Sequence, residues 1–231
     1  MKTIRCLSGA ELKHIAMVCM LADHLNKAII TPALAEVSCS WLLGLRGLLH
    51  VLGRFAFPIF SFLLVEGFYY TRNRWKYFWN LVLFAILSEI PYDLFIASDW
   101  VYTDAQNIFF TLALSLAVIW LIDSFKNNTR YWAFFVFLIT AVGCLLAVCG
   151  RVDYGSYGIL VSLAFYLFRF RPLVASIVGY FVLHKQIWSF PAFLLTTLYN
   201  GQRGKQYKWF NYWFYPLHLL ILEGIRWAVK L

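Results

Sequence analysis

Residues 130–149 read RYWAFFVFLITAVGCLLAVC, and after Arg130 this stretch carries no charged side chain. A helix needs about 20 mostly apolar residues to cross the hydrocarbon core of a bilayer. Further mostly apolar segments lie on both sides of it, at residues 12–31, 53–71, 76–97, 107–123, 156–170, 172–186, 187–200 and 209–229. The segments 172–186 and 187–200 are short, so they form either a tight pair of tilted spans or a pair in which one is re-entrant. The sequence therefore predicts an all-α fold, a polytopic transmembrane helical bundle of about 8–10 spans.

The composition agrees with a membrane protein. Hydrophobic residues make up 62% and charged residues 13% of the 231-residue chain, whereas soluble domains carry roughly 45–50% and about 25%. The net charge of +9 comes from basic residues in short loops between the apolar runs, which is typical of membrane topology and not of nucleic-acid binding. The five cysteines lack metal-ligand spacing, so no metal is expected.

The chain shows no linker and no internal repeat, which predicts a single integral membrane domain over residues 1–231. Residues 41–52 are apolar but carry Arg46 and His50. This pattern suits an amphipathic helix at the membrane interface or a lead-in to the second span. The first apolar run contains Asp23 and His24, so it reads as a retained span and not as a signal peptide.

The loops predict the orientation of the chain. One set of alternate loops holds ten basic residues and no acid: Arg72, Arg74, Lys76, Lys126, Arg130, Arg169, Arg171, Arg203, Lys205 and Lys208. The opposite loops mix acids and bases. By the positive-inside rule, the N-terminus and the basic loops face the cytoplasm. With nine spans the C-terminus lies outside, and with eight it lies inside.

Polar side chains within the first span are expected to be functional, because charged groups at the centre of a span cost roughly 2.5–3.5 kcal/mol. Lys13 and His24 are eleven residues apart, so they lie on one helix face with a rise of about 16 Å between them. Asp23 points about 100° away from His24. It is expected to bias the tautomer or pKa of His24 through a neighbour.

A second group of polar residues is expected at a similar depth. Glu89 and Asp93 share a face of the third span, with Arg54 on the second span as their counter-ion and Asn107 at the start of the fourth. With His24, these groups provide the parts of a general-base site with an oxyanion donor. Alternatively, Arg54, Glu89 and Asp93 form a structural ion-pair network. His218 is equally an interior hydrogen-bonding histidine or a site residue.

Several motifs together resemble the TraX family: LKHIAMVCMLADH at 12–24, GRFAFPIFSFLLVEGFYYTRNR at 53–74, LSEIPYD at 87–93, NIFFTLAL at 107–114, YGSYGIL at 154–160 and FYPLHLLIL at 214–222. The resemblance implies an integral acetyltransferase of the bacterial inner membrane, since the family's namesake acetylates the N-terminus of conjugative pilin from acetyl-CoA. The family is similar in organisation to the acyltransferase-3 membrane enzymes. Lys13 and His24 match their Arg/Lys-x10-His pattern, in which the histidine resembles a base.

The favoured hypothesis is therefore acetyl transfer from cytoplasmic acetyl-CoA to an amine or hydroxyl of a peptide, a pilin or a cell-surface glycan, in a protein whose other partner is membrane lipid. The candidate catalytic residues are His24, Asp23, Arg54, Glu89 and Asp93, and the candidate residues for binding CoA or the acceptor are Lys13, Glu66, Arg72, Asn107, Tyr157 and His218. A proton-coupled transporter or flippase is the alternative, because buried acids, arginines and histidines also form proton relays. A third hypothesis is that the protein is a non-catalytic membrane scaffold.

Overall fold

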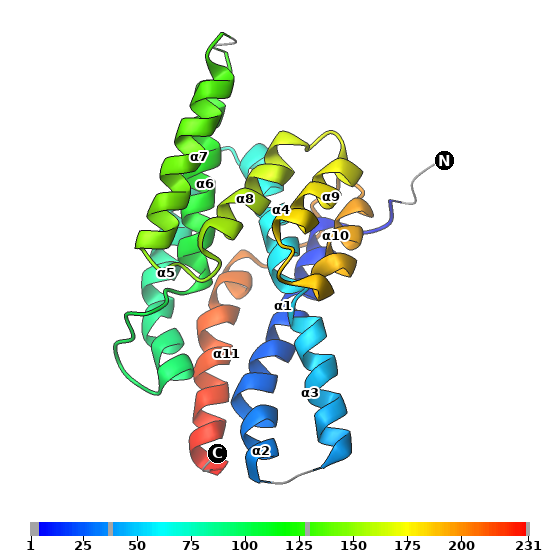
Figure 1. The fold of residues 1–231 in the computed structure, drawn as a ribbon, viewed down its shortest axis with the longest axis vertical. Helices are drawn as coiled ribbons and strands as arrows, with labels where there is room; N and C mark the ends of the chain where they lie inside the picture. The colour runs from blue at the N-terminus through cyan, green and yellow to red at the C-terminus, as the bar shows by residue number, and fades with distance from the viewer. Residues whose placement is uncertain (1–4, 37–38, 128–129, 230–231) are drawn as a thin grey trace. The chain divides into compact units, whose positions relative to one another are not determined.

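The computed structural model describes residues 5–36, 39–127 and 130–229. These residues form helices joined by turns, and their only β-structure is two isolated bridges, Leu7 with Tyr199 and Gln106 with Val152. The helices in chain order are α1 (Gly9–Leu25), a π-helix (Asn26–Ile30), α2 (Thr31–Glu36), α3 (Ser40–Gly53), α4 (Ala56–Tyr70), α5 (Arg74–Ala97), α6 (Ile108–Ser124), α7 (Trp132–Cys149), α8 (Gly155–Leu167), α9 (Pro172–Val182), a 3₁₀-helix (Ile187–Ser189), α10 (Phe190–Thr197) and α11 (Lys208–Val229) (Figure 1). The predicted all-α fold is confirmed.

Three stretches of the described chain are long and apolar enough to cross a membrane: Ser40–Tyr70, Arg74–Ala97 and Trp132–Cys149. Shorter apolar helices at Ile108–Ser124, Gly155–Leu167, Pro172–Val182 and Ile187–Thr197 accompany them. Only 17% of α7 is buried inside the protein, and its exposed side chains include Phe137 and Leu145. Because water does not favour so large an apolar surface, lipid is its natural solvent.

The observed helices follow the predicted spans closely. The stretch predicted as 41–52 is α3, and it continues past a turn at Arg54 into α4 as one apolar segment of 31 residues. Residues 41–52 thus lead directly into the second span, and the predicted position at the membrane interface stays a prediction. The first predicted span begins as α1 and becomes a π-helix at Asn26, two residues after His24. A π-helical turn inside a longer helix is frequent at functional sites.

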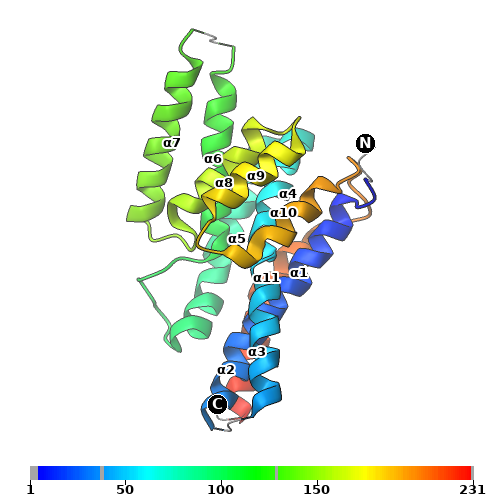
Figure 2. The same ribbon diagram turned by 45° about the vertical axis from the view of Figure 1, so that its right-hand side comes forward.

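The contacts within the chain group into two compact units, and the first contains residues 1–60, 90–102 and 185–231. In this unit α1 packs against α3 and α11, and the π-helix that follows α1 also contacts both (Figures 1 and 2). The start of α1 is fixed by a capping box, in which Ser8 caps the helix and Glu11 accepts from the Ser8 amide at 2.7 Å. These hydrogen bonds lower the pKa of the exposed Glu11 carboxyl.

The second unit contains residues 61–89 and 103–184. Here α6 and α7 lie side by side, and α8 packs against α6, α7 and α9 (Figure 2). Asn107 caps α6, since its side chain accepts from the Phe109 amide at 3.0 Å. A Cβ at Gly143 of α7 would collide with Val118 of α6, so the glycine permits the close approach of these two helices.

Candidate functional site

His24 lies at the end of α1, among aromatic rings of the first unit. Its Nδ1 is 2.7 Å from Nε2 of His218 on α11. The ring of Phe95 meets its ring edge-on at 5.2 Å between centroids, and Tyr215 lies 6.1 Å away. Three segments distant in the sequence therefore surround this imidazole: the end of α1, the C-terminal end of α5 and the middle of α11.

His218 is buried and makes a second hydrogen bond within its own helix. Its Nδ1 is 2.6 Å from the carbonyl oxygen of Phe214, one turn earlier on α11. The rings of His24 and His218 are inclined by only 22°, with centroids 4.9 Å apart. Nearly parallel rings place the lone pair of one nitrogen in line with the N–H of the other, which a hydrogen bond between them needs.

Asp23 precedes His24 and does not bond to it directly. Its carboxylate instead accepts from Arg54 at 2.8 Å and pairs with Lys27 at 2.7 Å. Gly53 makes this geometry possible, because a Cβ at this position would lie 2.5 Å from the Asp23 side chain. The Nε of Arg54 is buried without a hydrogen-bond partner, so the guanidinium retains an unused donor beside the His24 segment.

The ion pair with Asp23 was not anticipated, since Glu89 and Asp93 were the predicted counter-ions of Arg54. That predicted pairing stays a prediction. Asp93 is buried in the first unit, and its Oδ1 has no hydrogen-bond partner. Asp23 therefore orients Arg54, and its predicted influence on His24 stays a prediction.

Lys13 lies near the beginning of α1, beside a basic loop of the same unit. Its Nζ donates to Oε1 of Gln206 at 2.8 Å. The amide of Gly9 donates to the carbonyl of Gln202 at 2.8 Å, so the loop that carries Arg203 and Lys205 is tied to the start of this helix. The Lys13-to-His24 face predicted from spacing thus lies on one continuous helix, with added positive charge at the Lys13 end.

In the second unit, Glu89 and Asn107 bond to each other. The Asn107 side-chain amide donates to Glu89 and, at 2.7 Å, to the carbonyl of Ala85. Its oxygen caps α6. Both amide hydrogens of Asn107 are therefore engaged in holding the start of α6 against α5.

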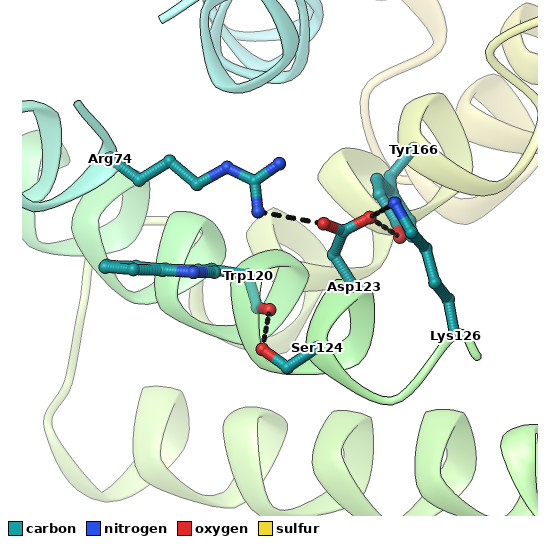
Figure 3. Close-up of polar contacts among 6 residues, drawn as sticks. All are labelled: Arg74, Trp120, Asp123, Ser124, Lys126 and Tyr166. Carbon is teal, nitrogen blue, oxygen red and sulfur yellow. Dashed lines mark hydrogen bonds and ion pairs between the residues drawn. The ribbon is translucent and has the colours of Figure 1, made fainter. Parts of the chain in front are cut away.

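A denser polar cluster in the second unit is centred on Asp123 at the end of α6 (Figure 3). Arg74 and Lys126 each donate to its carboxylate at 2.9 Å, and Tyr166 donates at 3.1 Å. Asp123 thus satisfies three donors from three segments.

Glu66 forms a neighbouring ion pair with Arg169, whose Nε donates to it at 2.8 Å. The Arg169 guanidinium lies 4.1 Å from the Tyr69 ring centroid, and Tyr69 stacks on Tyr166 with rings 14° from parallel. The Glu66 pair and the Asp123 cluster are thereby joined through aromatic rings.

The predicted site residues therefore fall into two groups. The first unit contains Lys13, Asp23, His24, Arg54, Asp93 and His218, and the second contains Glu66, Arg72, Glu89, Asn107 and Tyr157. Arg72 is exposed in the turn after α4, and Tyr157 meets His184 edge-on at 6.1 Å.

Sequence reasoning missed Asp123, Tyr166 and Arg169 as members of a cluster. Asp123 closes an apolar span, so the rule that an acid within a span seeks a partner was sufficient to flag it. Arg169 was interpreted only as a signal of topology. Nothing in the sequence distinguishes a basic residue that sets orientation from one that also pairs with a buried acid.

The fold and these contacts define an all-α membrane protein with buried histidine and ion-pair networks. A sequence model described as "TraX protein" matches residues 8–226, and the chain belongs to the TraX family. It is 25% identical to the probable fimbrial assembly protein FimC, serogroup H1, of Dichelobacter nodosus, in an alignment that covers 93% of this chain and 94% of the relative. No solved structure matches the chain significantly.

Proposed function

We propose that this protein is a membrane-embedded acyltransferase that moves an acetyl group from cytoplasmic acetyl-CoA to an amine or hydroxyl acceptor. The observation that carries the proposal is that His24 and Arg54 lie close together, because Arg54 bonds to Asp23, the residue before His24. An imidazole and a guanidinium with a buried, unused Nε–H come from the same small region of the first unit. Acyl transfer needs one group to take a proton and another to stabilise an oxyanion.

The proposed reaction uses these two groups directly. His24 removes the proton from the acceptor as its nitrogen or oxygen attacks the thioester carbonyl carbon. Arg54 donates to the carbonyl oxygen as negative charge develops there. The C–N or C–O bond forms, the C–S bond breaks, and His24 returns the proton to the departing thiolate. Asp23 holds Arg54 in place. Asn107 was the other predicted oxyanion donor, but its side-chain amide already donates to Ala85 and Glu89, so this scheme assigns the role to Arg54.

Lys13, Arg203 and Lys205 are the proposed site for the phosphates of CoA. Lys13 and the loop that carries the other two bases are tied together at the start of α1, and phosphate groups favour such clustered cations. With the N-terminus on the cytoplasmic side of the inner membrane, this end of the helix faces the supply of acetyl-CoA. The pantetheine arm would then extend along α1 toward His24. Arg72, Glu66 and Tyr157 stay predicted contacts of donor or acceptor.

The acceptor is proposed to be a subunit of a surface fibre, such as pilin. The relative named as a probable fimbrial assembly protein supports this choice, because a protein subunit carries amines and hydroxyls that can accept an acetyl group. A surface peptide or glycan offers the same nucleophiles to the same chemistry.

The test is acetyl transfer by the purified full chain in lipid nanodiscs, with radiolabelled acetyl-CoA and envelope proteins as acceptors. His24→Gln is expected to lower the rate by about 10²–10⁴-fold, the usual contribution of a general base. His14→Gln is the matched control, since His14 is exposed on the same helix. Full activity in His24→Gln would contradict the proposal. Movement of an unmodified substrate across sealed liposomes would instead support the transporter.

A further inference from the structure

The hydrogen bonds of His218 determine which nitrogen of His24 carries a proton. The Phe214 carbonyl oxygen can only accept, so the 2.6 Å contact requires a hydrogen on His218 Nδ1. A neutral imidazole has one N–H, so His218 Nε2 is an acceptor. The 2.7 Å contact then requires His24 Nδ1 to be the donor.

This order of donors fixes the chemistry of His24. Its single hydrogen is on Nδ1, so its Nε2 carries the lone pair. When Nε2 takes a proton, the Nδ1–H stays donated to His218, and the imidazolium forms without a change of ring orientation. His24 is thus a base oriented by a neighbouring group, His218, which is itself held by its hydrogen bond to the Phe214 carbonyl.

Asp23 cannot do this work in the observed structure. Its carboxylate is occupied by Arg54 and Lys27, at 2.8 and 2.7 Å. His218 stands where hydrolases often place an acid. A neutral acceptor suits this position, because a carboxylate here would add a second buried charge near the Asp23–Arg54 pair.

We propose that His218 is a positioning residue that holds His24 in the Nδ1–H tautomer, with Nε2 as the base. This proposal rests on the proposed acetyl transfer for its catalytic meaning. The tautomer itself is a property of the resting protein, and it is measurable without any reaction.

The first experiment is ¹⁵N NMR of the full chain in nanodiscs with labelled histidine, at about pH 8, well above the ordinary histidine pKa of about 6.5. Comparison with His24→Gln and His218→Gln samples assigns the two signals among the five histidines. The wild type is expected to show His24 protonated at Nδ1 and unprotonated at Nε2. An Nε2–H tautomer at His24 in the wild type would overturn the proposal, whatever the variants do.

The second experiment compares two substitutions of His218. Phenylalanine keeps the ring but removes the acceptor, so kcat is expected to fall by about 10²-fold or more, as it does when a catalytic histidine loses its orienting partner. Glutamine supplies an acceptor oxygen, so the kcat of His218→Gln is expected to be at least about tenfold higher than that of His218→Phe. The KM for acetyl-CoA is expected to stay unchanged in both variants, since neither touches the Lys13 end of α1.

The outcomes separate this proposal from the proposed function. If the wild type transfers no acetyl group, the function fails while the NMR measurement still decides the tautomer. If transfer occurs and folded His218→Phe keeps the wild-type kcat, the positioning role is wrong. If His218→Phe does not fold, the wild-type tautomer and the kcat of His218→Gln decide the matter. Equal losses of kcat in folded glutamine and phenylalanine variants would also count against it.

Discussion

The Asp123 cluster of the second unit and the Asp23–Arg54 pair of the first differ in how fully their groups are paired. In the second unit, Asp123 accepts from three donors, and Arg169 bonds to Glu66 while its guanidinium covers the Tyr69 ring. In the first unit, Arg54 keeps a buried Nε–H without a partner. His24 uses only its Nδ1 in the hydrogen bond to His218.

This difference separates a structural network from a functional one. A network whose donors and acceptors are all paired stabilises one arrangement and has few free groups to bind a substrate. A buried donor without a partner costs free energy, and such costs are retained where a ligand or a reaction later satisfies the group. Substitutions at His24 and the Asp23–Arg54 pair are therefore expected to affect rate, and substitutions in the Asp123 cluster to affect stability.

Among the tests of this contrast, the largest expected effect is on catalysis, from Arg54→Gln. Glutamine can still donate to Asp23 but lacks the charge and the Nε–H, so kcat for acetyl transfer is expected to fall by about 10²–10³-fold. The measurement is steady-state kinetics in nanodiscs. The control is Arg46→Gln, at an exposed position of α3, which should keep the wild-type rate. A normal kcat in Arg54→Gln would place Arg54 with the structural pairs.

The next effect is on stability, from Asp123→Asn in the second unit. Loss of the charge weakens the bonds to Arg74, Lys126 and Tyr166, and about 2–3 kcal/mol of unfolding free energy is expected to be lost, as for a buried hydrogen-bonded charge. Chemical denaturation in detergent measures it, and kcat per folded molecule should stay unchanged.

Asp104→Asn is the matched control for that substitution. Asp104 pairs with Arg151 at 2.7 Å, but their side chains are 70% and 56% exposed. An exposed pair contributes about 0–1 kcal/mol. Equal losses in the two variants would show that the buried cluster is no more structural than a surface pair.

The sequence was sufficient for the helices because hydropathy is a local signal. The apolar run at 130–149 predicts a membrane-spanning helix, and α7 forms over most of this run. The Lys13-to-His24 face was also predictable, because a single helix fixes it by spacing alone.

Partners between helices were not predictable, because they depend on packing. Several acids were expected at the same membrane depth as Arg54, so depth alone did not identify its partner. The ion pair with Asp23 requires the absence of a side chain at Gly53. Likewise, the meeting of His24 with His218 joins residues 194 positions apart. No periodicity within either helix specifies that contact.

The smallest effect, and the sharpest test of the first unit's geometry, is expected from Gly53→Ala. The new Cβ would lie 2.5 Å from Asp23, so α1 and α3 must move apart and Arg54 loses its alignment. Overpacking of this kind costs about 1–3 kcal/mol, and we expect a loss near 1–2 kcal/mol because the turn at Arg54 can absorb part of the strain. Gly47→Ala is the matched control in the same helix, since no atom lies within 4 Å of a Cβ there and alanine favours a helix by about 1 kcal/mol over glycine. Gly53→Ala should therefore lower both stability and kcat, while Gly47→Ala should lower neither. If both variants behave alike, the close approach at Gly53 is not what holds the Asp23–Arg54 pair, and the contrast between the two units loses its structural cause.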